Sequence, residues 1–265
     1  MIKTIQEAFS QKAFIPFITA GDQGLDVTER YIRTMVKAGA DLLEIGIPFS
    51  DPVAEGPVIQ AASERALSAG TTTAKIFDMV ARLRQGDADN EPVTIPLIVM
   101  TYINPVYVYG KDTFFSKCQE VGINGIIVPD MPFEEKGEIA DEAKAHNVAI
   151  ISMIAPTSEN RIEKIAKEAE GFSYCVSSLG VTGVRSEIKT DIKSIVASIR
   201  KYTDIPVAVG FGISTPEQAE HMTEVADGAI VGSAIVKIIA KEGKEADQAL
   251  TDYVQAMKAA VSANN

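Results

Sequence analysis

Eight short runs of apolar and β-branched residues recur along this chain of 265 residues, and they constrain its fold more than any other feature. Each run is continuously apolar rather than alternating, which is typical of parallel strands that are covered on both faces. Segments with the residue spacing of amphipathic helices lie between the runs. We therefore predict repeated β/α units on a parallel sheet. The expected strands are Phe14–Ile18, Leu42–Ile47, Ile95–Met100, Gly125–Val128, Val148–Ile154, Tyr174–Val176, Pro206–Val209 and Ala229–Val231.

The helical segments complete these units. Gly56–Gly70 predicts an extra helix in the wide interval after the second strand, and no linker rich in proline or glycine divides the chain. The sequence therefore predicts an α/β fold, a single (β/α)8 (TIM) barrel over residues 1–265 with this inserted helix; a doubly wound open sheet is the alternative. In either fold the chemistry belongs at the carboxyl ends of the strands. The expected helices are Val27–Lys37, Thr73–Arg84, Asp112–Glu120, Glu134–His146, Glu159–Glu170, Ile188–Arg200 and Pro216–Val225.

The charge balance narrows the possible partners. A formal net charge of -11, with no basic block, makes nucleic acid or an anionic membrane a poor partner because both must be met by positive charge. No uncharged apolar run reaches membrane-spanning length, and the N-terminus lacks a signal-peptide core. The two cysteines, Cys118 and Cys175, cannot build a disulfide framework, so we expect a cytoplasmic protein.

Two acids near the second strand are candidate catalytic residues. Glu44 interrupts the apolar run Leu42–Ile47, and burial there would raise its pKa into the range of general acid/base chemistry. A structural ion pair is the other interpretation of Glu44. Glu55 follows eleven residues later in a loop, where an acid could either flank the same pocket or favour the dipole of the next helix.

Glycines follow the last expected strands. Gly210-Phe211-Gly212 and Gly232-Ser233 each precede an expected helix, so we predict a phosphate site in which backbone N–H groups at two helix N-termini hold the anion. Leu179–Gly183, after the sixth expected strand, is a third segment that could contribute to this phosphate site. No cluster of His, Cys or carboxylates has metal-ligand spacing, and no dinucleotide or Walker loop occurs, so no metal and no cofactor is expected. Phe17, Tyr102 and Tyr174 either pack in the core or line the pocket of a planar aromatic substrate.

Taken together, these segments resemble the α subunit of tryptophan synthase over almost the whole chain. A strand-and-loop motif, Glu44-x-Gly-x-Pro-Phe-Ser-Asp-Pro52 with a second acid at Glu55, is not a general feature of barrels. The other matching segments are Pro16–Asp22, Tyr102–Pro105, Pro129–Pro132, Gly180–Gly183 and Gly210–Ile213.

The resemblance implies a lyase that cleaves indole-3-glycerol phosphate to indole and glyceraldehyde 3-phosphate by a retro-aldol reaction. It makes Glu44 the general acid/base at indole C3 and Glu55 the acceptor of a hydrogen bond from the ring N–H. It also implies that Thr182 belongs to a loop that closes over the site and contacts the second acid. Phosphate would be held by Gly183, Gly212, Gly232 and Ser233, and the substrate would be surrounded by Phe17, Tyr102 and Tyr174.

The same resemblance implies a partner, a pyridoxal-phosphate β subunit that receives the indole in an α2β2 complex. The α chain itself would carry no cofactor. Interface candidates are Pro48, Asp51, Asn104 and Pro132. One position departs from the family, which usually has aspartate where this chain has Glu55. A weakly catalytic subunit that mainly activates the β partner, and a different phosphate-binding barrel lyase or isomerase, are the alternative functions.

Overall fold

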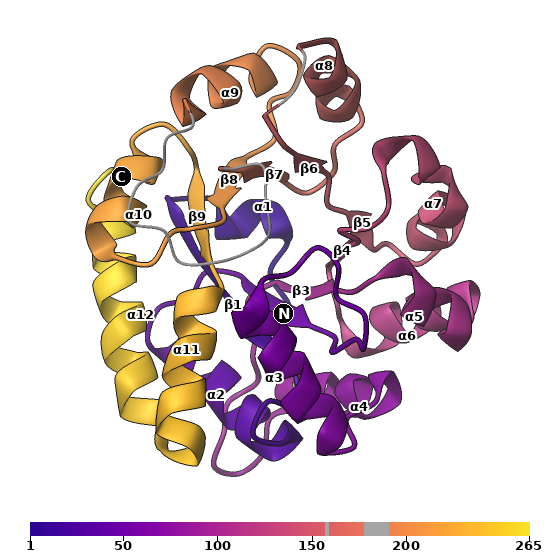
Figure 1. The fold of residues 1–265 in the computed structure, drawn as a ribbon, viewed down its shortest axis with the longest axis vertical. Helices are drawn as coiled ribbons and strands as arrows, with labels where there is room; N and C mark the ends of the chain where they lie inside the picture. Colours follow the sequence, from indigo (N-terminus) through magenta and orange to yellow (C-terminus); the bar gives the residue numbers. More distant parts are fainter. Residues whose placement is uncertain (157–158, 178–190) are drawn as a thin grey trace.

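The computed structural model describes residues 1–156, 159–177 and 191–265. Its strands form one sheet in which every pairing is parallel, surrounded by helices (Figure 1). The strands are β1 (Ala13–Thr19), β2 (Leu43–Gly46), β3 (Leu97–Met100), β4 (Gly125–Ile127), β5 (Ala149–Ile150), β6 (Met153–Ile154), β7 (Ser173–Val176), β8 (Val207–Gly210) and β9 (Gly228–Val231).

The two ends of this sheet are consecutive in the chain. The strand order is β5-β4-β3-β2-β1-β9-β8-β7-β6, so only Ile151 and Ser152 separate the first strand from the last. The N–H of Ile151 donates to the carbonyl of Ile126 on β4 (2.9 Å), and the carbonyl of Ser152 accepts from the N–H of Tyr174 on β7 (3.0 Å). The sheet therefore closes into the predicted TIM barrel.

The run Val148–Ile154, expected as one strand, is two short strands because its pairing changes from β4 to β7 at this bend. The expected helix Glu134–His146 is also divided, into a 3-10 turn η1 (Phe133–Glu135) and a shorter helix α7 (Gly137–Ala145). The start of the expected helix Ile188–Arg200 lies outside the described residues.

Helices connect the strands. Two of them, α3 (Pro57–Ser68) and α4 (Thr73–Gln85), separate β2 from β3, and α12 (Asp247–Ser262) packs against β1 and α2 (Leu25–Lys37). Helices α1 (Ile5–Ala8), α5 (Ile103–Tyr109) and α12 had no counterpart among the sequence predictions. The remaining helices are α6 (Lys111–Val121), α8 (Glu159–Lys167), α9 (Ile192–Ile199), α10 (Pro216–Thr223) and α11 (Ser233–Glu242), with a short 3-10 turn η2 (Gly243–Glu245).

Buried apolar side chains form two clusters, as a closed barrel requires. One lies between the sheet and the helices and includes Ile18, Ile45 and Val99. The other includes residues of alternate positions on the same strands, such as Phe17 and Ile98, together with Ile5 of α1. Neighbouring strand residues thus belong to different clusters, which places Phe17 and Ile98 inside the barrel.

The C-terminal residue lies beside the start of β1. The N–H of Lys12 donates to Asn265 Oδ1 (2.6 Å), and β1 pairs with β9 from Ala13↔Gly228 onward. Across the three described segments, none of the helices is both long and apolar enough to cross a membrane.

Candidate active site

Glu44 lies inside the barrel on β2. Its register partner on β1 is Phe17, and only 2% of Glu44 is exposed. Gly46, two residues further along β2, makes room for the Phe17 ring: a Cβ atom at Gly46 would lie 2.6 Å from Phe17 Cζ. The Glu-x-Gly spacing of the motif therefore places a carboxyl group and an aromatic ring together at the carboxyl end of the barrel.

Glu55 reaches the same region from the loop that joins β2 to α3. The N–H of Glu55 donates to the carbonyl of Pro52 (3.1 Å), and the carbonyl of Glu55 accepts from Gln60 Nε2 (2.8 Å). The residue is 6% exposed. An acid that only interacts with the dipole of α3 could remain exposed to solvent. The burial of Glu55 therefore argues against its interpretation as a simple helix-terminal acid.

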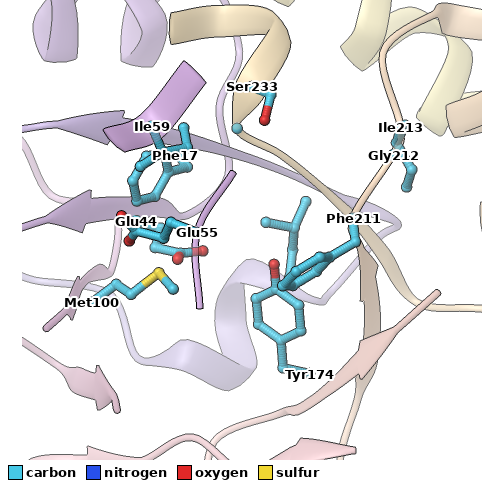
Figure 2. Close-up of a pocket in the computed structure, with 12 residues that line it drawn as sticks. Phe17, Glu44, Glu55, Ile59, Met100, Tyr174, Phe211, Gly212, Ile213 and Ser233 are labelled. Carbon is cyan, nitrogen blue, oxygen red and sulfur yellow. The ribbon is translucent and has the colours of Figure 1, made fainter. Parts of the chain in front are cut away.

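The two glutamates line one cavity (Figure 2). The wall is otherwise mostly apolar, and the accessible volume is about 40 Å³, room for little more than ordered water. The lining residues are Phe17, Glu44, Glu55, Ile59, Met100, Tyr174, Phe211, Gly212, Ile213, Ile230, Gly232 and Ser233.

The apolar surroundings change the acidity of both carboxyl groups. Burial, and secondarily the charge of Glu55, raises the pKa of Glu44 to about 8, while burial raises the pKa of Glu55 to about 7. Among residues 1–156, 159–177 and 191–265, no ion pair includes Glu44 or Glu55, so the structural ion-pair interpretation of Glu44 finds no support there. Both groups therefore change protonation near neutral pH, which is the property that general acid/base chemistry needs.

The glycine loops reach the cavity at Gly212, Gly232 and Ser233. Gly232 is the N-cap of α11, which begins at Ser233 and is ten residues long, so the N-terminus of this helix opens toward the cavity. Gly212 has a φ of +83°, which glycine adopts easily, and Phe211 before it has the rarer φ of +74°. This arrangement offers backbone N–H groups to an anion.

The prediction of two free helix N-termini was wrong for α10. The N–H groups of Ser214 and Thr215 donate to Gln218 Oε1 (2.8 and 3.2 Å), and the N–H of Gln218 donates back to Thr215 Oγ1 (3.3 Å). This capping box occupies the N–H groups of Ser214, Thr215 and Gln218 and does not include Gly212, the expected phosphate contact before α10. Of α10 and α11, α11 is the one whose N-terminus has no side-chain cap.

Two of the three aromatic candidates line the cavity, and the third contacts the β2–α3 loop. Phe17 and Tyr174 line the cavity, and Figure 2 shows the ring of Tyr174 beside Phe211. Tyr102 is not among the cavity-lining residues of the described segments: its ring stacks on Phe49 and its hydroxyl accepts a hydrogen bond from the N–H of Ala54. Thr182 and Gly183 lie outside the described residues.

Sequence reasoning missed the apolar part of the wall. Ile59, Met100, Phe211, Ile213 and Ile230 line the cavity. Phe211 stands between the glycines of the predicted phosphate loop, and Ile59 lies on the predicted inserted helix shortly after Glu55. Their closeness in sequence to candidate site residues could therefore have identified these two as lining residues. Met100 and Ile230 read as ordinary strand residues and carried no such signal.

The interface candidates differ in exposure. Asp51, Asn104 and Pro132 are exposed in loops and helix starts at the carboxyl side of the barrel, whereas Pro48 is buried. Two large apolar side chains nearby are exposed, Val53 in the β2–α3 loop (75%) and Val108 on α5 (80%). No group of three or more His, Cys, Asp or Glu side chains suited to a metal ion occurs in the described part of the chain.

A closed (β/α)8 barrel with two protonatable carboxyl groups and a helix N-terminus at one apolar cavity defines an enzyme of the TIM-barrel class. A family model described as tryptophan synthase alpha chain matches residues 4–263. The chain therefore belongs to the tryptophan synthase α chain family.

Relatives and solved structures agree with this membership. The tryptophan synthase alpha chain of Lacticaseibacillus casei is 46% identical over 254 residues, which cover 96% of this chain and 93% of that protein. That of Halalkalibacterium halodurans is 51% identical over 227 residues, or 85% and 83% of the two chains. The crystal structure of tryptophan synthase subunit alpha from Legionella pneumophila has a TM-score of 0.84 at 34% identity and covers 98% of this chain and 99% of its own.

The activity follows from the family. The chain is a lyase of tryptophan biosynthesis that cleaves indole-3-glycerol phosphate to indole and glyceraldehyde 3-phosphate.

Proposed function

We propose that Glu44 is the general acid and base of this cleavage. Protonated Glu44 donates its proton to C3 of the indole ring. The resulting carboxylate then accepts the proton of the side-chain hydroxyl as the bond between indole C3 and the glycerol carbon breaks. The electrons of that bond return to the ring, an aldehyde forms on the phosphate-bearing fragment, and Glu44 ends protonated as it began. No proton is gained or lost overall.

Glu55 has the complementary task of stabilising the intermediate protonated at C3. Its carboxylate accepts a hydrogen bond from the ring N–H, which carries positive charge in that intermediate. The observation that carries both assignments is that Glu44 and Glu55 share one cavity with raised pKa values of about 8 and 7. At neutral pH this favours a proton on Glu44 and leaves a large share of Glu55 ionised, as the two tasks demand.

The remaining lining supports binding of the two ends of the substrate. Phe17 and Tyr174 flank the indole, and the backbone at Gly212, Gly232 and Ser233 holds the phosphate. Burial and the charge of Glu44 raise the pKa of the Tyr174 hydroxyl, so this group remains protonated and can donate a hydrogen bond. The resemblance implies a phosphate contact for Gly183 and a contact with Glu55 for Thr182, two residues outside the described part of the chain.

The partner in this proposal is a tryptophan synthase β subunit, in an α2β2 complex. Exposed Val53 and Val108, together with Asp51, Asn104 and Pro132, lie in segments that follow the carboxyl ends of β2, β3 and β4, and such a mixture of apolar and polar side chains suits docking there. Pyridoxal phosphate belongs to the β subunit, and this chain works without a cofactor of its own.

We place the protein in the cytoplasm, where buried free thiols such as Cys118 and Cys175 stay reduced. The whole chain, 1–265, acts as one catalytic domain.

Indole release from indole-3-glycerol phosphate tests the proposal. The purified chain is assayed with and without a β subunit from the same source, and Glu44→Gln is compared with Glu64→Gln, a matched change on the exposed face of α3. We expect release that rises with the β subunit, is lost in Glu44→Gln and persists in Glu64→Gln. Turnover retained by Glu44→Gln would remove Glu44 from its role. No release by the parent, with complex formation intact, would favour the activating-subunit alternative.

A further inference from the structure

We propose that Tyr102 is a positioning residue: its ring and hydroxyl hold the β2–α3 loop so that Glu55 reaches the cavity, and it does not contact the substrate. This inference rests on the proposed role of Glu55.

One side chain holds the loop at two points. The Tyr102 hydroxyl accepts a hydrogen bond from the N–H of Ala54 (2.9 Å), the residue directly before Glu55. The Tyr102 ring stacks on Phe49, with ring centroids 5.0 Å apart and an angle of 29° between the ring planes. Phe49 and Ala54 stand near opposite ends of the segment that follows β2, so Tyr102 fixes both the start of the loop and its approach to Glu55.

Tyr102 is itself firmly placed. It is 2% exposed and lies between β3 and α5. The N–H of Thr101 before it donates to the carbonyl of Ile127 (3.0 Å), and the N–H of Ile103 after it donates to Asp130 Oδ1 (3.0 Å). The position of the phenol is therefore set by β3 and β4 of the barrel rather than by the loop that it holds.

The phenol also lies within electrostatic reach of Glu55. Burial raises the pKa of the Tyr102 hydroxyl, and the Glu55 charge raises it further. The hydroxyl therefore stays protonated at any working pH and can accept from Ala54 as a neutral group. Tyr102 is not among the residues that line the cavity with Glu55. Tyr102 therefore acts on the reaction through its contacts with the β2–α3 loop.

Tyr102→Phe tests this inference because it keeps the stacked ring and removes only the oxygen. The Ala54 N–H loses its partner, and a displaced Glu55 carboxylate should lower kcat about tenfold while KM changes less than about twofold. The matched control is Tyr109→Phe, which removes a hydroxyl from the other end of α5 and should leave both constants unchanged. Thermal unfolding of each variant monitors the fold.

A double-mutant cycle with Glu55→Gln separates positioning from contact and from a purely structural effect. If Tyr102 acts through Glu55, Tyr102→Phe has no further effect on kcat in the Glu55→Gln background. The acidic limb of the pH profile, which reports Glu55, should also shift in Tyr102→Phe.

Two results would overturn the inference, and they can be told apart. A Tyr102→Phe defect that persists at full size in the Glu55→Gln background, or that appears as a higher KM at constant kcat, would remove the positioning role alone. A parent rate unaffected by Glu55→Gln would remove the role of Glu55 and the positioning role with it.

Discussion

The carboxyl groups of Glu44 and Glu55 line the same buried cavity, and the charge of Glu55 contributes to the raised pKa of Glu44. One comes from the second strand of the barrel and the other from the loop that follows it. Two acids in an apolar pocket cannot both ionise without mutual repulsion, so their protonation states are coupled. Several consequences of this relationship can be measured.

The rate of cleavage should have a narrow, bell-shaped pH dependence. Below about pH 7 Glu55 gains a proton and no longer accepts from the ring N–H, and above about pH 8 Glu44 loses the proton that it must donate. A profile of kcat/KM between pH 5 and 10 should show both limbs, with apparent pKa values that belong to the pair. Glu55→Gln should remove the acidic limb. A flat profile across this range would contradict the assignment.

Glu44→Gln should make the folded chain more stable, and more so as the pH rises. Unfolded glutamate ionises near pH 4.5, whereas folded Glu44 keeps its proton to about pH 8, so the parent loses stability as the pH rises between these values. Glutamine does not ionise, so the variant keeps the free energy of unfolding that the parent loses, which is at most about 5 kcal/mol. Urea unfolding of both proteins at pH 4.5 and pH 8 measures this difference in free energy. An equal difference at both pH values would show that folding does not raise the pKa of Glu44.

Glu55→Asp should lower kcat even though it restores the residue usual in the family. The loop backbone is held by Pro52, Gln60 and Tyr102, so it cannot easily follow a side chain that is shorter by one methylene. We expect a loss of about tenfold with little change in KM, since a displacement of this size weakens positioning. Steady-state measurements of kcat and KM for the purified parent and variant test this prediction. An equal or higher kcat would mean that the loop adapts.

Gly212→Asp should weaken substrate binding. The new carboxylate repels the phosphate and fills part of the cavity, and the φ of +83° adds strain. Gly243→Asp is the matched control, because Gly243 also has a positive φ of +60° and open space around it. We expect KM to rise more than about tenfold in Gly212→Asp and to stay unchanged in the control. Equal KM values in both variants would place the phosphate elsewhere.

Gly46→Ala should disturb the aromatic wall. The new methyl group would lie 2.6 Å from Phe17 Cζ, so the ring must turn away from its place beside Glu44. Overpacking of this kind costs about 1–3 kcal/mol, and the displaced ring should also raise KM for indole-3-glycerol phosphate. Gly137→Ala, at a site with nothing within 4 Å of the new atom, is the control. Thermal unfolding and kinetics of the two variants would show whether the close approach of Phe17 matters.

Local patterns in the sequence predicted much of this molecule. Continuous apolar runs predicted the parallel strands, because a strand covered on both faces must be apolar at every position. Glu44 stood out as a candidate site residue for the same reason: an ionisable group within such a run is unfavourable unless a cavity or partner accepts it. Gly232 and Ser233 could be placed at the start of a helix because the end of the strand and the start of the helix are adjacent in the chain.

Only the tertiary structure decided which of these groups meet. The break at Ile151 and Ser152 arises because the chain exchanges one neighbouring strand for another as the barrel closes. The burial of Glu55 and the contact of Tyr102 with Ala54 depend on how the β2–α3 loop folds over strand β3. The cap made by Gln218 closes α10, although the glycines before both helices look alike in sequence. The sequence by itself determined the elements and their order, since those follow from interactions between near neighbours. The contacts between distant segments depend on packing in three dimensions.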